Sequence, residues 1–283
     1  MQTNNPVLTR MEQEAKRNGG YAGFGAATTT AIAPDAAAPQ QPYDAPATLP
    51  GVQAPTAPMT IADVIVKSAA MFAIVFVFAF GSWQLELTPG ISIISMLVAT
   101  GLGFWGALSK QIRPLVFLGY SLFMGIALGG VSLMWATYAA EPGTDAVNTT
   151  IVVQAIIGTF AAFAAMLFLY ATRIIKVTER FKRFMLIALV GYLFVAIGSF
   201  VAALFGVGEG LGFYGSGGIG LLLCVVGVAL AAFSLALDFD AIEMAIKAGA
   251  PERESWRGAF GLVVTLVWLY LEILRLLAIL NRS

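Results

Sequence analysis

The ionisable residues that could do chemistry in this chain lie next to or inside long apolar runs. In the stretch SLALDFDAIE, Ser234–Glu243, two aspartates, Asp238 and Asp240, end an uncharged apolar run. The last apolar run, GAFGLVVTLVWLYLEILRLLAIL, contains Glu272 and Arg275. Ionisable groups inside a membrane are costly and mark ion paths or proton relays. The spacing therefore points to an ion or proton site, although Asp238 and Asp240 could equally mark the end of a membrane helix.

The composition limits the other kinds of chemistry. The chain has no histidine and one cysteine, Cys224, which excludes histidine-dependent hydrolysis, histidine-bound zinc and an internal disulfide. Its formal net charge is zero, so nothing indicates a nucleic-acid partner. We therefore expect no enzyme activity and no cofactor, and we expect calcium, if it has a role, to be a transported ion.

An all-α membrane protein is predicted from hydrophobicity. Hydrophobic residues make up 59% of the chain, charged residues 11%, and the mean hydropathy is +0.84. About 20 apolar residues are needed to cross a bilayer. Seven runs meet this length, and Thr60 with Asp63 resembles a capping box at the first. The predicted spans are 61–82, 91–109, 115–138, 151–172, 184–206, 218–238 and 258–280.

Residues 1–57 differ from the remainder of the chain. Eight of the twelve prolines fall at or before Pro58, among Ala, Thr, Gly and Gln. Such a segment buries too little apolar surface to offset its ordering entropy. We predict a disordered cytoplasmic tail over 1–57 and a seven-helix transmembrane domain over 58–283. The sequence does not identify the protein partners of this tail.

Basic residues divide the connections into two groups. Lys and Arg occur in the N-terminal tail, after the second span, between the fourth and fifth, and between the sixth and seventh, whereas the other connections carry only acids. Those acids are Glu86, Glu141, Asp145 and Glu209. The positive-inside rule then predicts a cytoplasmic N-terminus and an external C-terminus. The glycine-rich connection at 206–218, GVGEGLGFYGSGG, is expected to be a flexible outer loop.

The seventh span has a polar face. Six of its residues recur at steps of three and four and so share one side of a helix. They are Gly258, Gly261, Thr265, Trp268, Glu272 and Arg275. Small and polar residues on one stripe indicate packing against other helices, so we predict that this span is central, with Glu272 and Arg275 paired one turn apart. Lys67, in the first span, could be a further inward charge or could snorkel to the interface.

Four segments resemble those of a known family. They are LDFDAIEMAIKAG, with Phe239-Asp240 as the match, LYLE at Leu269–Glu272, LLAIL at Leu276–Leu280, and QAIIGTFAAFAAM in the fourth span. The chain resembles the Bax inhibitor-1 (transmembrane Bax inhibitor motif) superfamily in its bacterial branch. The resemblance covers 61–283 and leaves the proline-rich tail outside. It implies an integral protein of the bacterial cytoplasmic membrane.

The resemblance implies a pH-sensitive calcium leak gated by two helical acids. Carried over, the pair is Asp240 with Glu272, Asp240 being preferred to Asp238, and the same oxygens could line a path for calcium or another cation. Two close carboxylates in low dielectric share a proton, and its loss at higher pH adds repulsion that opens the path. Arg275 and Lys67 favour the ionised acids and so tune the switching pH.

Two observations leave this assignment open. Counting along straight helices puts Glu272 about 18 Å deep and Asp240 near the inner surface, so tilt or a later helix start must intervene for them to meet. A second function class also fits the same sequence, a non-conducting membrane interaction protein that modulates a protease or a stress response. Flux measurements separate the two classes.

Overall fold

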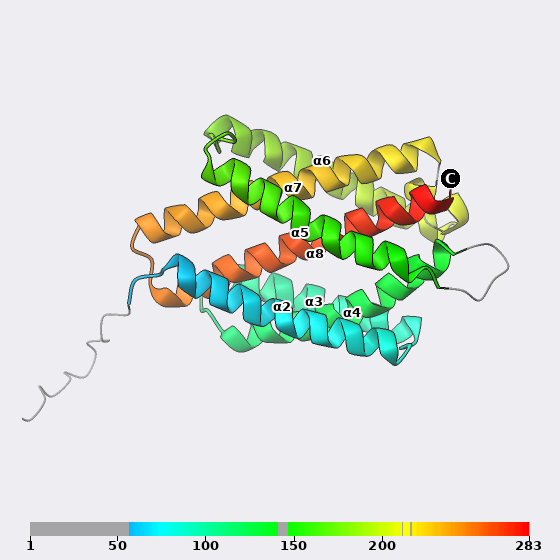
Figure 1. The fold of residues 1–283 in the computed structure, drawn as a ribbon, viewed down its shortest axis with the longest axis horizontal. Coiled ribbons are helices and arrows are strands. Elements are labelled where there is room, and N and C mark those ends of the chain that lie inside the picture. Colours follow the sequence, from blue (N-terminus) through cyan, green and yellow to red (C-terminus); the bar gives the residue numbers. More distant parts are fainter. Residues whose placement is uncertain (1–56, 141–146, 211, 216, 283) are drawn as a thin grey trace, which may run out of the picture. The chain divides into compact units, whose positions relative to one another are not determined.

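The computed structural model describes residues 57–140, 147–210, 212–215 and 217–282. Within them, seven long helices are long and apolar enough to cross a membrane, which confirms the predicted all-α, seven-span, multi-pass membrane fold (Figure 1). They are α2 Ile61–Gln84, α3 Pro89–Leu108, α4 Pro114–Tyr138, α5 Thr149–Ala171, α6 Glu179–Leu204, α7 Gly218–Lys247 and α8 Ser255–Arg282. The predicted disorder before residue 57, and the acids Glu141 and Asp145, lie outside the described residues.

One helix end differs from the sequence prediction in a way that matters for the site. The sixth span was predicted to end at 238, but α7 continues to Lys247. Asp238 and Asp240 are therefore inside a helix and do not mark its end. Two charges alone do not stop a helix, because carboxylates remain compatible with helical backbone. The break comes at Gly249, whose φ of 67° only glycine adopts easily, followed by Pro251.

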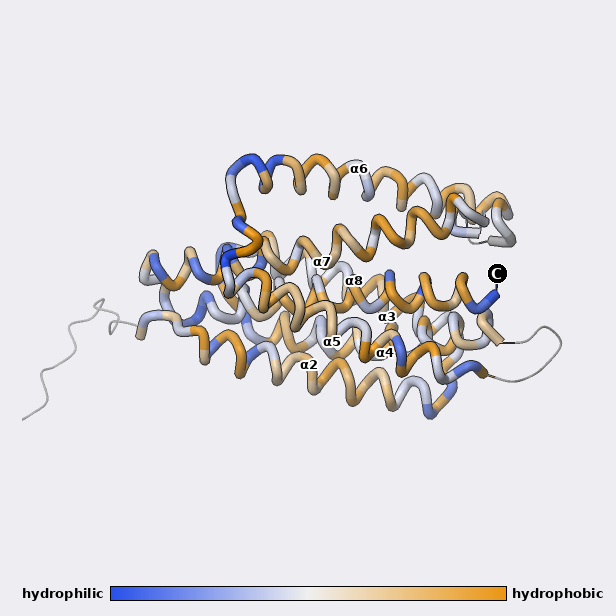
Figure 2. The backbone as a smooth tube through the Cα atoms, turned by 45° about the horizontal axis from the view of Figure 1, so that its top comes forward, coloured by the Kyte–Doolittle hydropathy of each residue, from blue (hydrophilic) through white to orange (hydrophobic). Residues whose placement is uncertain are grey.

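The basic connections gather at one end of the bundle. Arg257 of α8 donates to the Ser109 carbonyl at the end of α3, 2.8 Å away. Arg173, just after α5, pairs with Glu243 of α7 at 3.3 Å. The backbone N–H of Met59, before α2, donates to the Ala250 carbonyl after α7. We call this end of the bundle the basic end; Figure 2 shows hydrophobic residues along the helices and hydrophilic residues mainly at their ends.

Helix α8 is the central helix, as predicted. It packs against α2, α4, α5 and α7 (Figure 1). Its apolar side chains Ala259, Val263, Leu269 and Leu274 have no exposed surface. The side opposite the polar stripe is therefore buried against neighbouring helices as well.

Close packing of α2 on α4 depends on two glycines four residues apart. A Cβ added at Gly125 would lie 2.6 Å from the Val75 carbonyl oxygen, and one at Gly129 would collide with the Ala79 carbonyl oxygen. Ser82 of α2 donates across this interface to the Ile126 carbonyl at 2.9 Å. Small residues at this spacing let membrane helices approach backbone to backbone.

Helix α6 is the least buried of the seven spans. It lies beside α7 at the edge of the bundle (Figure 1 and Figure 2). Along its length only Met185 and Ser199 are buried. Few apolar contacts hold this helix, so its polar contacts contribute a large share of its attachment.

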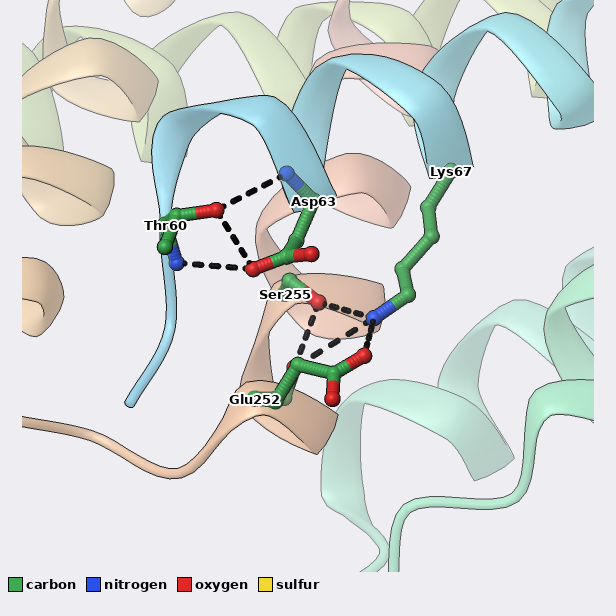
Figure 3. A network of polar contacts seen from close by, with 5 residues as sticks. All are labelled: Thr60, Asp63, Lys67, Glu252 and Ser255. Atoms are coloured by element: carbon green, nitrogen blue, oxygen red, sulfur yellow. Dashed lines mark hydrogen bonds and ion pairs between the residues drawn. The ribbon is translucent and has the colours of Figure 1, made fainter. Parts of the chain in front are cut away.

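A polar cluster at the basic end joins the start of α2 to the start of α8 (Figure 3). The predicted capping box is present, with Thr60 and Asp63 bonding reciprocally. One turn later, the Lys67 ammonium donates to Ser255 Oγ at 2.6 Å and to Glu252 Oε1 at 3.0 Å. Its side chain is only 14% exposed. Lys67 therefore fixes the connection between α7 and α8 in place.

Replacement of Lys67 by methionine should destabilise the protein by about 1.5–3 kcal/mol, because the buried Ser255 hydroxyl and the Glu252 carboxylate lose a charged donor. Lys110→Met, at an exposed lysine of the same end, is the control and should change the free energy of unfolding by less than about 0.5 kcal/mol. The measurement is unfolding of the purified protein in detergent. Equal effects of the two substitutions would show that the cluster contributes nothing specific.

Candidate functional site

The most enclosed charged side chain in the described helices belongs to Glu272 of α8, which is 3% exposed. Its Oε1 accepts hydrogen bonds from the Tyr192 hydroxyl at 2.8 Å and from Trp268 Nε1 at 3.0 Å. Arg275 Nη1 lies 3.2 Å from Oε2, which is the predicted pairing one turn along the helix. These three donors fix the Glu272 carboxyl group in position.

Glycine on the neighbouring helix makes room for this carboxylate. A Cβ at Gly227 of α7 would lie 2.6 Å from Glu272 Oε2 and would collide with the Tyr192 hydroxyl. Any larger residue at 227 would displace the Glu272 carboxylate or the Tyr192 hydroxyl from its present position. Gly227 therefore sets the depth at which Glu272 meets α6.

A second tyrosine completes the hydrogen-bond chain. Tyr214, in the 3-10 turn η2 (Gly212–Gly215), donates to the Tyr192 hydroxyl at 2.9 Å. Burial raises the pKa of Tyr214, although its hydrogen bond with Tyr192 and the charge of Arg275 oppose the shift. The Tyr214 hydroxyl thus keeps its proton at neutral pH and can donate it toward Tyr192, which in turn donates to Glu272.

Part of the glycine-rich connection contributes to the site. Its described part forms the 3-10 turns η1 (Val207–Gly210) and η2. Ser199 of α6 accepts from the Phe213 N–H at 3.0 Å, and a Cβ at Gly212 would collide with the Ser199 backbone. The glycines here permit close backbone approach, and they deliver Tyr214 to the site.

Arg275 is held by aromatic rings as well as by Glu272. Its guanidinium carbon lies 4.2 Å from the Tyr214 ring centre and 5.9 Å from that of Trp135. Guanidinium groups stack favourably on aromatic faces, more so away from water. The cluster therefore contains one anion and one cation that compensate each other.

These side chains line a pocket of about 610 Å³ between α6 and α8. Residues of α3 and α4 complete its wall. The lining residues are Met96, Trp135, Leu189, Tyr192, Leu193, Ala196, Ser199, Phe200, Ala203, Tyr214, Trp268, Glu272 and Arg275. A pocket of mostly apolar walls with a few convergent polar groups is the usual form of a functional site.

Asp240 does not meet Glu272, contrary to the prediction. Its Oδ2 pairs with Lys182 of α6 at 2.9 Å, at the basic end. Glu272 lies beside Gly227, thirteen residues earlier in α7, or about 20 Å along the helix axis. Counting residues along straight helices had placed Asp240 and Glu272 at different depths, and the structure has this separation. Neither helix tilt nor a later start of the last helix brings the two acids together. Among the described residues, no three acidic or cysteine side chains gather in a way that could hold a metal ion, so Asp240 and Glu272 form no joint calcium site.

Asp238 is the aspartate that faces the central helix. A Cβ at Gly261 of α8 would lie 3.4 Å from its Oδ1, and its Oδ2 is buried without a hydrogen-bond partner in the described structure. The sequence left open which aspartate faces the bundle, and the structure shows that Asp238 does. The preference for Asp240 as the partner of Glu272 is wrong, since Asp240 pairs with Lys182. Asp238 is also not paired with Glu272, because eleven residues separate it from Gly227, about 16 Å along α7.

Lys67 is far from Glu272. It bonds Ser255 at the start of α8, whereas Glu272 lies seventeen residues further on, about 26 Å along the axis. Of the two cations predicted to tune the site, only Arg275 contacts Glu272. The cation that pairs with Asp240 is Lys182, as Arg275 pairs with Glu272. The sequence placed Lys182 among the basic residues between the fourth and fifth spans.

Sequence reasoning missed Tyr192, Tyr214 and Gly227. Tyr192 carried a usable signal, since a tyrosine in the middle of an apolar span needs a partner for its hydroxyl. Tyr214 carried a weaker one, because an aromatic residue within a glycine-rich connection is also typical of an interfacial anchor. Gly227 is one glycine among several in the same helix, and its role depends on which residue faces it.

Comparison with known proteins gives one family. The model described as Bax inhibitor 1 like matches residues 5–282. The match begins at residue 5, so it includes nearly all of the proline-rich tail that the resemblance over 61–283 left outside. Among curated proteins, no significant match was found.

Proposed function

The chain belongs to the Bax inhibitor 1 like family, and on this premise we propose that it is a pH-sensitive cation leak protein with calcium as its transported ion. Its role is then transport and not catalysis. The observation that carries the proposal is that two acids, Asp240 of α7 and Glu272 of α8, each bond a side chain of the sparsely packed helix α6.

The two attachments lie at different depths of the same helix. Lys182 and Tyr192 are ten residues apart in α6, about 15 Å along its axis. Lys182 bonds Asp240 of α7, and Tyr192 bonds Glu272 of α8. Since few apolar side chains hold α6, loss of both bonds would let it move away from α7 and α8. Movement of α6 would widen the pocket that Glu272 lines.

The same acids mark a route for a cation. Glu272 stands at the pocket, Asp238 faces α8 about 16 Å closer to the basic end, and Asp240 lies two residues further along α7, about 3 Å. Calcium prefers carboxylate and carbonyl oxygens. Carboxylates spaced in series can pass a cation onward without trapping it, because no position offers a complete set of ligands.

The direction of the pH effect follows from the charges around each acid. Asp240 faces Lys182 of α6, with Glu179 and Tyr170 close by, and Glu272 faces Arg275, Tyr192 and Tyr214. Protonation of Asp240 cancels the charge that holds Lys182. Protonation of Glu272 weakens its acceptance from Tyr192 and its pairing with Arg275. Acid therefore favours release of α6, which is the reverse of the direction expected from two acids that share a proton.

Calcium flux into proteoliposomes should accordingly rise as the pH falls. Asp240→Asn should raise flux at neutral pH roughly two- to fivefold, if its partly exposed ion pair contributes about 0.5–1 kcal/mol to the closed state. Glu272→Gln should raise neutral flux as well, and it should flatten the pH profile because an amide does not titrate. The measurement is dye-reported calcium uptake across a pH series.

Glu243→Gln is the matched control for these variants. Glu243 lies one turn beyond Asp240 in α7, but its partners are Tyr170, Arg173 and Lys247, none of which belongs to α6. Its pH profile should resemble the wild type. Unchanged profiles in both Asp240→Asn and Glu272→Gln would end the gating proposal. Absence of any wild-type flux would favour the non-conducting interaction protein.

For the placement in the cell, we propose the bacterial cytoplasmic membrane with the basic end inside. The basic connections lie together at one end of the bundle, which supports this orientation because Lys and Arg are retained on the cytoplasmic side. The N-terminus would then be cytoplasmic and the C-terminus external. Reporter fusions at residue 282 that are active in the cytoplasm would overturn the orientation.

A further inference from the structure

A second cavity, of about 370 Å³, lies on the other side of α8 from Glu272's pocket. Its walls come from α2 and α5, which both pack against α8 (Figure 1), and α4 contributes to the floor. We propose that this cavity, called the acyl slot below, binds one acyl chain of a membrane lipid from the leaflet opposite the basic end. The proposal is independent of ion conduction.

The shape of the slot supports a chain entering from the bilayer. Its floor is buried, with Val75, Leu128 and Leu266 each at most 6% exposed. Its rim is open, since Phe80 and Phe160 are more than half exposed. Such a slot opens sideways in the membrane-spanning part of the bundle, where the surrounding solvent is hydrocarbon.

The length and direction of the slot match one leaflet. Along α2 it extends from Phe72 to Gln84, about 18 Å, and along α5 from Thr149 to Phe160, about 16 Å. Half of a typical hydrocarbon core is about 15 Å. Gln84 and Thr149 stand at helix ends away from the basic end, so a lipid headgroup would sit there with its chain pointing inward.

The chemistry of the slot excludes water and ions as its occupants. Its lining contains no charged residue among the described positions. The deeper hydroxyls are already bonded, Ser132 with Tyr270 at 2.6 Å and Thr159 with the Ala155 carbonyl at 2.7 Å. A buried water needs two to four polar partners, which the slot does not offer. Acyl methylenes need none, and their burial against aromatic and aliphatic walls is favourable.

Two other occupants fit less well. The N-terminal segment joins the domain at the basic end, whereas the slot opens toward the opposite end. A helix from a second copy, about 10–12 Å across with its side chains, needs far more space than the cavity's volume of about 370 Å³. The neutral lining also predicts that the chain is recognised and the headgroup is not.

The experiment is native mass spectrometry of the full-length protein extracted from vesicles of palmitoyl-oleoyl phosphatidylcholine or phosphatidylglycerol. The wild type should retain one lipid per chain, with similar occupancy for both headgroups. Ile156→Trp places a ring in the slot and should reduce occupancy roughly tenfold, because the ring fills the space of the chain and removes its packing contacts. The Ile157 side chain points outward and is 63% exposed, so Ile157→Trp leaves the slot open and should retain lipid as the wild type does.

The same spectra separate the outcomes. Val153→Trp narrows the slot from its rim and replaces Ile156→Trp if that variant does not fold. Absence of retained lipid in the wild type overturns the proposal. It is also overturned if a slot variant, Ile156→Trp or Val153→Trp, retains as much lipid as the control Ile157→Trp. A dimer mass that the filling variants abolish overturns it in favour of a second copy. If Ile156→Trp and Val153→Trp still bind one headgroup better than the other, the proposal is overturned, because the lipid then binds outside the slot.

Discussion

Replacement of Gly129 by leucine is expected to destabilise the membrane domain by about 3 kcal/mol or more, because the new side chain collides with backbone and not with a movable side chain. Its Cβ alone would overlap the Ala79 carbonyl oxygen of α2. Helix α2 would have to move away from α4, which would also stretch the bond from Ser82 to the Ile126 carbonyl. The measurement is the free energy of unfolding in mixed detergent.

Gly101→Leu is the control for this substitution. Gly101 is also a glycine within a membrane helix, but a Cβ there meets nothing within 4 Å. Its replacement should change the free energy by less than about 0.5 kcal/mol, or even stabilise the helix, since glycine is a poor helix former. If both variants unfold alike, close approach of α2 and α4 is not what holds these helices together.

The sequence was sufficient to predict the number of helices and the position of the central one. Hydrophobic length is a local property, so each run could be counted without knowing its neighbours. The polar stripe containing Thr265 and Glu272 identified the last span as central, because such residues are too costly to face lipid. The end of α7 was misplaced because Asp238 and Asp240 resemble a boundary, while the actual stop lies at Gly249.

The site was predicted only in part, because partner choice between helices depends on their relative height. Glu272 and Arg275 belong to one helix, and their pairing follows from spacing alone. The partner of Glu272 across the bundle depends on how α6 and α7 are shifted along α8. Gly227 leaves room for the Glu272 carboxylate at the height where it meets Tyr192. An acid pair transferred by resemblance therefore failed: Glu272 lies in the predicted last helix, and Asp240 lies in the part of α7 that continues beyond the predicted end at 238.

The pair of Glu272 and Arg275 should show strong coupling in unfolding measurements. Glu272→Gln keeps an oxygen to accept from Tyr192 and Trp268 but leaves the Arg275 charge without its partner. We expect a cost of about 3 kcal/mol, the lower end for breaking a buried ion pair, since the Arg275 side chain is 22% exposed. Arg275→Met should cost less at low pH than at neutral pH, because Glu272 can then take up a proton, whereas an arginine cannot lose one.

The double variant decides between an ion pair and mere crowding. With Glu272→Gln and Arg275→Met together, no unpaired charge remains, the methionine still fills space beside Tyr214 and Trp135, and the glutamine still accepts from Tyr192. The double variant should therefore be more stable than Glu272→Gln alone by about 2 kcal/mol. Its loss of stability would then be far smaller than the sum of the two single losses. Additive losses would show that the two side chains act independently. The cluster would then be held by its aromatic packing, and Glu272 would keep α6 in place through Tyr192 alone.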